Sequence, residues 1–95
     1  MRWRDLREQR VRIPDHVVFR DMVQETVLLN IKTGHYHGID RIGARFFEVM
    51  CSGLPLSGAA SELADEFRQP IERIEQDLAS FSETLMTLGL IELEP

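Results

Sequence analysis

Cysteine, tryptophan and tyrosine each occur only once in this sequence of 95 residues, and long apolar runs do not occur at all. A single cysteine, Cys51, excludes an internal disulfide, and within an apolar helix such a thiol is typically packed rather than reactive. No apolar run approaches the roughly 18 residues that a membrane span needs. The segment Met1–Glu8 is too interrupted by charge to form a secretory signal, so we expect a cytoplasmic protein without a membrane partner.

The sequence also lacks the motifs that usually surround catalytic groups. No glycine-rich phosphate loop and no nucleophile elbow accompanies any histidine, cysteine or aspartate, which argues against an enzyme. His35 and His37 are two residues apart on a predicted strand, so both rings project from one face and could contact a metal. A third ligand would have to come from His16, Cys51 or Asp40. We therefore expect no catalytic site, metal ion or cofactor, and interpret both histidines as edge-strand side chains.

Charge is unevenly distributed along the chain. The net charge is −5 overall and +3 within residues 1–12, where five arginines accompany two acidic residues, so residues 13–95 carry −8. Because nucleic-acid affinity depends on Lys and Arg side chains that neutralise phosphates, this acidic body argues against a nucleic-acid partner. We interpret residues 1–13 as a flexible, basic N-terminal tail and residues 14–95 as a single domain, since the chain is too short for two.

Apolar and β-branched segments predict three antiparallel strands in the first part of the domain. The first lies near residues 16–20, and the second, Thr26–Ile31, is nearly all apolar and is expected to be covered on both faces. Lys32-Thr33-Gly34 suits a three-residue hairpin loop in which Gly34 adopts the left-handed conformation. The chain then returns as a third strand over His35–Ile39.

Three helices are predicted after these strands. Asp40 caps the first, whose apolar stripe includes Ile42, Ser57 caps the second, and Pro70 stands at the start of the third. Gly89 ends the third helix, and residues 90–93 add a short final strand. This order predicts an α+β fold of the winged helix-turn-helix type, with a three-stranded antiparallel sheet followed by three helices. Apolar residues form a continuous seam along the third helix: Ile71, Ile74, Leu78, Phe81, Leu85 and Leu88.

A winged helix-turn-helix first suggests DNA binding, with the third helix in the major groove. Between residues 71 and 88, however, Arg73 is accompanied by Glu72, Glu75, Asp77 and Glu83, a net charge of −3. Duplex DNA would repel such a helix. A DNA-binding regulator therefore stays an alternative from another class of function.

The third strand suggests a different kind of binding. If it lies at the edge of the sheet, its unpaired N–H and C=O groups can pair with an incoming peptide strand. The same edge could pair with a second copy of the chain, which would give a homodimer. The third helix would form the other side of a peptide site, with four candidate residues: Arg73, Asp77, Phe81 and Thr84.

An ordered set of residues extends over roughly residues 16–93. Its members are Val27-Leu28-Leu29-Asn30, Thr33-Gly34, Tyr36, Ile39-Asp40, Gly43-Ala44, Phe47, Asp77-Leu78, Phe81, Leu85 and Gly89-Leu90-Ile91. This set resembles the PqqD family, which comprises the pyrroloquinoline quinone biosynthesis chaperone and the precursor-recognition elements of ribosomally made, post-translationally modified peptides.

The resemblance implies a non-catalytic module that binds the leader segment of a precursor peptide by strand addition and delivers it to a modifying enzyme or leader protease. In this family an aromatic pair is common near the third strand, and here that pair is Tyr36-His37. For this reason we favour lasso-type peptide maturation. Pyrroloquinoline quinone biosynthesis is the alternative. The peptide-binding residues expected from the resemblance are His35, Tyr36, His37, Gly38 and Ile39 on the strand and Arg73, Ile74, Asp77, Leu78 and Phe81 on the third helix.

Overall fold

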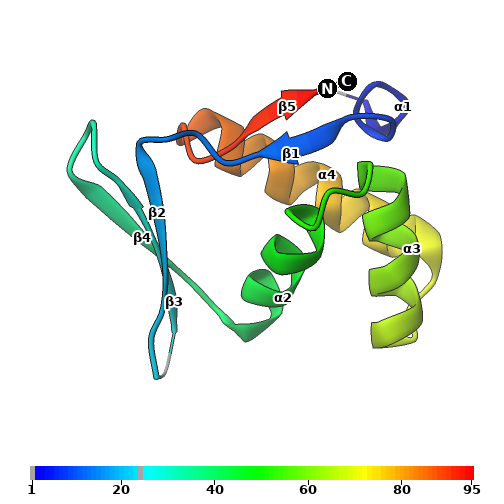
Figure 1. Cartoon of the computed structure of the whole chain (residues 1–95). Helices are drawn as coiled ribbons and strands as arrows, with labels where there is room; N and C mark the ends of the chain where they lie inside the picture. Colours follow the sequence, from blue (N-terminus) through cyan, green and yellow to red (C-terminus); the bar gives the residue numbers. More distant parts are fainter. Residues whose placement is uncertain (1, 24) are drawn as a thin grey trace.

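The computed structural model describes residues 2–23 and 25–95. Figure 1 shows a three-stranded sheet on one side of the molecule, helices on the other, and two short strands side by side near both chain termini. The α+β, winged helix-turn-helix-like fold predicted from the sequence is confirmed. In chain order the elements are α1 (Trp3–Leu6), β1 (Arg10–Arg12), β2 (Val17–Asp21), β3 (Thr26–Asn30), β4 (His35–Ile39), α2 (Arg41–Met50), α3 (Leu56–Phe67), α4 (Ile71–Thr87) and β5 (Glu92–Glu94).

The main sheet has the strand order β2-β3-β4, and all its pairs are antiparallel. Leu28 in the middle of β3 lies opposite Phe19 of β2 and His37 of β4. Burial alternates along β3, whose residues 26, 28 and 30 are buried while Val27 and Leu29 are only half-buried. The prediction that this strand is covered on both faces is therefore wrong for one face, because the helices all lie on the other side of the sheet (Figure 1).

The hairpin between β3 and β4 is one residue longer than predicted. Asn30 pairs with His35, so residues 31–34 form the loop, and the N–H of Ile31 instead donates to the C=O of His16 at 2.8 Å. Gly34 has φ of 75°. This confirms its left-handed conformation, which a glycine adopts at little steric cost.

The helix caps follow the sequence in part. The side chain of Asp40 accepts a hydrogen bond from the N–H of Gly43 at 2.7 Å, which confirms the predicted cap of α2. Ser57 is not the cap of α3. The cap position is Pro55, two residues earlier, and the helix begins at Leu56, because the N–H groups of Gly58 and Ala59 donate to the C=O of Pro55 at 2.9 and 3.1 Å.

The core lies between the inner face of the sheet and the three long helices. Phe19 of β2 stacks on Phe47 of α2 with ring centroids 5.6 Å apart. Ile42 was expected in the apolar stripe of α2 but is 59 % exposed, because the helix reaches the core only from Phe46 onward. The largest fully buried side chains are Leu6, Leu28, Phe47, Met50, Leu56, Leu63, Leu78 and Leu90.

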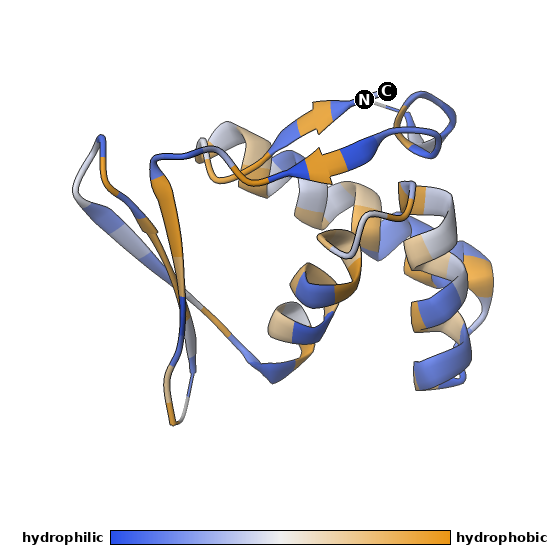
Figure 2. Cartoon of the chain, in the orientation of Figure 1, coloured by the Kyte–Doolittle hydropathy of each residue, from blue (hydrophilic) through white to orange (hydrophobic). Residues whose placement is uncertain are grey.

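Residues 2–13 differ from the predicted flexible tail. They contain α1 and β1, and β1 pairs with β5 so that Val11 lies opposite Leu93. Figure 2 shows both strands as hydrophilic with a hydrophobic centre. Leu6 is fully buried and the N–H of Leu56 donates to the C=O of Gln9 at 2.9 Å, so apolar anchors hold this segment to the body despite its arginines.

None of the helices in the described residues combines the length and the apolar character needed to cross a membrane.

Candidate functional site

Strand β4 forms an edge of the main sheet. It pairs with β3 on one side, and within residues 2–23 and 25–95 no strand pairs with its other side. Backbone N–H and C=O groups of an antiparallel strand point alternately to its two sides. The free edge of β4 therefore presents main-chain groups at every second residue.

The hydrogen bonds of β3 show which residues of β4 direct their main-chain N–H and C=O groups to the free edge. The Ile31 N–H donates to the C=O of His16, and the Met22 N–H donates to the C=O of Glu25, both at 2.8 Å. Odd-numbered residues of β3 thus direct their main chain to β2, and even-numbered residues direct it to β4. Through the register, residues 35, 37 and 39 of β4 face β3. Tyr36 and Gly38 consequently direct their N–H and C=O groups to the free edge.

Side chains of β4 alternate between the two faces of the sheet. His35, His37 and Ile39 share the inner face, which carries the buried residues of β3 and packs against the helices. Tyr36 and Gly38 share the opposite, outer face. His37 and Ile39 are half-buried, whereas Tyr36 is 73 % exposed.

Helix α4 contacts the sheet near both ends of β4. At one end, the Nδ2 of Asn30, the pairing partner of His35, donates to the C=O of Leu88 at 3.4 Å. At the other end Phe81 and Ile39 both lie close to Gly43 of α2, where a Cβ would be 3.5 Å from the Ile39 Cβ and 3.8 Å from the Phe81 Cζ. The end of α4 and its C-cap, Leu88, therefore lie near the start of β4, and Phe81 lies near its end, so the two segments run in opposite directions. We call β4 together with Phe81, Thr84 and Leu88 the β4–α4 surface.

The α4 residues expected to bind peptide separate into three groups. Ile74 and Leu78 are 3 % and 0 % exposed, so they belong to the core and are not available to a ligand. Phe81 is half-buried beside β4, with its ring edge-on to the core residue Phe46. Arg73 and Asp77 are exposed, but they line a groove beside Trp3 of α1, together with Pro70, Glu72, Glu75 and Gln76.

Sequence reasoning assigned Leu88 to the buried seam, but it is 38 % exposed at the end of α4. It lines a shallow groove along that helix with Ser80, Glu83, Thr84 and Thr87. The sequence spacing already indicated that Leu88 lies at the margin of the apolar seam, because positions 77, 81, 84 and 88 recur at helical steps along one side of it.

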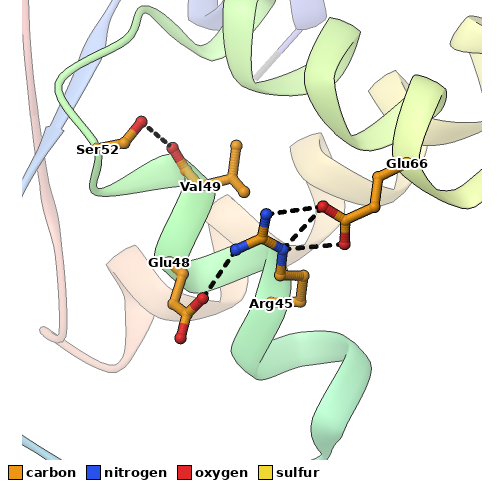
Figure 3. A network of polar contacts seen from close by, with 5 residues as sticks. All are labelled: Arg45, Glu48, Val49, Ser52 and Glu66. Carbon is orange, nitrogen blue, oxygen red and sulfur yellow. Dashed lines mark hydrogen bonds and ion pairs between the residues drawn. The ribbon is translucent and has the colours of Figure 1, made fainter.

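A polar network outside the β4–α4 surface joins α2 to α3. Arg45 donates from Nε and Nη2 to Glu66 at 2.7 to 2.9 Å and from Nη1 to Glu48 at 2.9 Å (Figure 3). The hydrogen bonds from Arg45 lower the pKa of the Glu66 carboxyl, and those carboxylates raise the pKa of Arg45. Because these charges satisfy one another, we assign the network to helix packing.

In the described part of the chain, neither the reactivity of Cys51 nor the arrangement of possible metal ligands favours a catalytic or metal site. Burial raises the pKa of the Cys51 thiol to about 12, so the thiol is protonated at neutral pH and is a weak nucleophile. Among the described residues, no group of three or more His, Cys, Asp and Glu side chains could hold a metal ion. His35 and His37 do share one face, as predicted from their spacing.

Comparison with known proteins places this arrangement in a family. Residues 25–91 match the family described as Coenzyme PQQ synthesis protein D (PqqD). The chain belongs to the PqqD family. The matched PqqD segment includes β3, β4 and all three long helices, and therefore every element of the β4–α4 surface.

Two solved structures resemble this PqqD-family chain. "TbiB1 in Complex with the TbiA(beta) Leader Peptide" has 30 % sequence identity and a TM-score of 0.79, and the alignment covers 85 % of this chain and 94 % of that one. "Lasso peptide synthetase B1 complexed with the leader peptide" has 20 % identity and a TM-score of 0.73, with coverages of 86 % and 96 %. At 20 % identity the second likeness supports the fold alone. Among curated proteins, no sequence matches significantly.

Proposed function

We propose that this protein binds the leader segment of a ribosomally made precursor peptide as an additional strand on β4, beside α4. The observation that carries the proposal is the free edge of β4, with the main-chain groups of Tyr36 and Gly38 directed outward. TbiB1, which is 30 % identical over most of its length, has been solved with a leader peptide bound. A free sheet edge is the feature that strand addition requires.

Main-chain pairing would supply affinity at this edge. The outward N–H and C=O groups of Tyr36 and Gly38 can form four hydrogen bonds with an added strand. At roughly 0.5 to 1.5 kcal/mol net for each bond, these contribute about 2 to 6 kcal/mol. Main-chain bonds alone are insensitive to sequence, so selection among peptides must come from side chains.

Side chains of the added strand would alternate between the two faces of the sheet. Those on the inner face would approach Phe81, Thr84 and Leu88 of α4, where the half-buried Phe81 and the exposed Leu88 offer apolar contact. We propose that this margin of α4 recognises the leader. Arg73 and Asp77 lie further along α4 beside Trp3, so we assign them at most a contact with one end of the peptide.

We further propose that the protein is not itself an enzyme and that it delivers the precursor to a leader protease or modifying enzyme. Lasso-type maturation is favoured over pyrroloquinoline quinone synthesis because Tyr36-His37 replaces the aromatic pair that is common near this strand in the family. Two copies paired through their β4 edges would compete with the leader for the same main-chain groups.

Amide hydrogen exchange measured by NMR tests the proposal directly. In the free protein the amides of Tyr36 and Gly38 should exchange fast, whereas that of His37, which faces β3, should be protected. Saturation with a bound peptide should slow exchange at Tyr36 and Gly38. The peptides to use are the TbiA(beta) leader and sequences selected on this protein from a random displayed library. Unchanged exchange at both residues with a saturating peptide would refute strand addition to β4.

A further inference from the structure

The outer face of the sheet carries an acidic side chain close to the free edge. Glu25 directly precedes β3, and by alternation its side chain lies on the same face as Val27 and Leu29. Through the register this is also the face of Tyr36 and Gly38 on β4. Glu25 therefore shares a face with the two residues whose main chain points outward.

The carboxylate of Glu25 extends over Gly38. A Cβ built at Gly38 would lie only 2.7 Å from Oε2 of Glu25 and 3.4 Å from its Cδ, so the carboxylate occupies the space that a side chain at position 38 would need. In the described part of the chain, no hydrogen bond or ion pair involves this carboxylate. An exposed negative charge thus lies beside the free edge of β4, at a position where the edge strand itself has no side chain.

We propose that Glu25 selects peptides that carry lysine or arginine at the position opposite Gly38 on the outer face. This inference rests on the proposed strand addition. Directly opposite residues of neighbouring strands have Cβ atoms about 5 Å apart. Because Gly38 places no side chain between them, a long basic side chain of the added strand can cross the strand and reach the Glu25 carboxylate. An acidic side chain at that position is repelled instead.

The effect is a moderate preference, because both partners are solvent-exposed. Exposed ion pairs change affinity by a few-fold, so the lysine peptide should bind about three- to fivefold more tightly than the glutamate peptide. High salt should reduce this ratio, since the Debye length falls to about 3 Å at 1 M. The preference is confined to one position of the peptide, which separates it from general attraction of basic peptides to an acidic protein.

A charge scan of the peptide tests the inference. The probes are the TbiA(beta) leader peptide and a peptide selected on the wild-type protein from a random displayed library, each with single Lys or Glu replacements along its length. Fluorescence anisotropy gives the ratio of Kd values, Glu over Lys, at each position. One position should show a three- to fivefold ratio that falls to about one in Glu25→Gln and persists in Glu62→Gln, a matched change of an exposed carboxylate on α3.

Gly38→Ala supplies a second variant with Glu25 intact. Its Cβ displaces the carboxylate, so the Glu-over-Lys ratio of Kd values at that peptide position should fall toward one. Ratios that stay equal in the wild type and in Glu25→Gln, for peptides that protect the Tyr36 and Gly38 amides, overturn the role of Glu25 and leave strand addition standing. If neither probe protects those amides, strand addition fails, and the inference fails with it.

Discussion

Proline at position 36 tests the assignment of the free edge most directly. Tyr36 directs its N–H away from β3, so Tyr36→Pro removes a donor that pairs with no strand in the described residues. Edge strands tolerate proline when the missing N–H faces solvent. The matched control is Tyr36→Ala, which removes the 73 % exposed ring and keeps the N–H. Any difference between the two variants therefore reports on the main chain at the edge.

The expected magnitude follows from the pairing at the edge. Tyr36→Pro loses one hydrogen bond to the added strand, and its ring crowds the neighbouring one, so peptide binding should weaken by about 1 to 2 kcal/mol relative to Tyr36→Ala. This corresponds to a roughly 5- to 30-fold higher Kd. Both variants should melt within a few degrees of each other, because neither breaks a bond to β3.

Fluorescence anisotropy with a labelled peptide measures the Kd, and circular dichroism measures the melting temperature. His37→Pro supplies the contrast, because His37 faces Leu28 of β3 and its loss of an N–H should lower the melting temperature clearly. The assignment of the edge is refuted if Tyr36→Pro and Tyr36→Ala bind peptide equally well. It is also refuted if Tyr36→Pro melts as low as His37→Pro.

Two further predictions concern stability and reactivity. Asp40→Ala removes the cap of α2 and should lower the free energy of unfolding by about 1 kcal/mol, which corresponds to a melting temperature lower by roughly 4 to 8 °C. Asp40→Ser is the control, because serine can still cap the helix. Equal melting curves for the two variants would contradict the role of this hydrogen bond. Cys51 should react with Ellman's reagent at pH 8 far more slowly in the native protein than in guanidinium chloride. The rate of the native protein should keep rising with pH toward the thiol pKa of about 12. A rate that levels off below pH 10 would count against the buried thiol.

Local sequence patterns determined most of the elements. The β-branched segments, the left-handed turn at Gly34 and the Asp40 cap act over a few residues, and each has the predicted conformation. The predictions that failed depend on distant partners. Ile42 has the spacing of a buried helical residue, yet nothing in the neighbouring sequence indicates that the first turn of α2 extends past the core.

The N-terminal segment is the clearest example of a structure that depends on contacts with residues far along the chain. Five arginines within residues 1–12 resemble a solvated tail by composition. Leu6 and Val11 nevertheless find partners far along the chain, in the core and at Leu93 of β5. Because burial of a few apolar side chains can outweigh exposed charge that stays in water, composition alone could not reveal this docking.

The sequence by itself determined the fold class, the family resemblance and the strand that offers an edge, since these follow from local periodicity and ordered motifs. Only the tertiary structure decided which residues of that strand are free. The register places His37 against β3 and leaves Tyr36 and Gly38 outward, because antiparallel main-chain groups alternate in direction. The structure likewise buries Ile74 and Leu78 in the core and brings Glu25 over Gly38, since these placements depend on packing between separate segments.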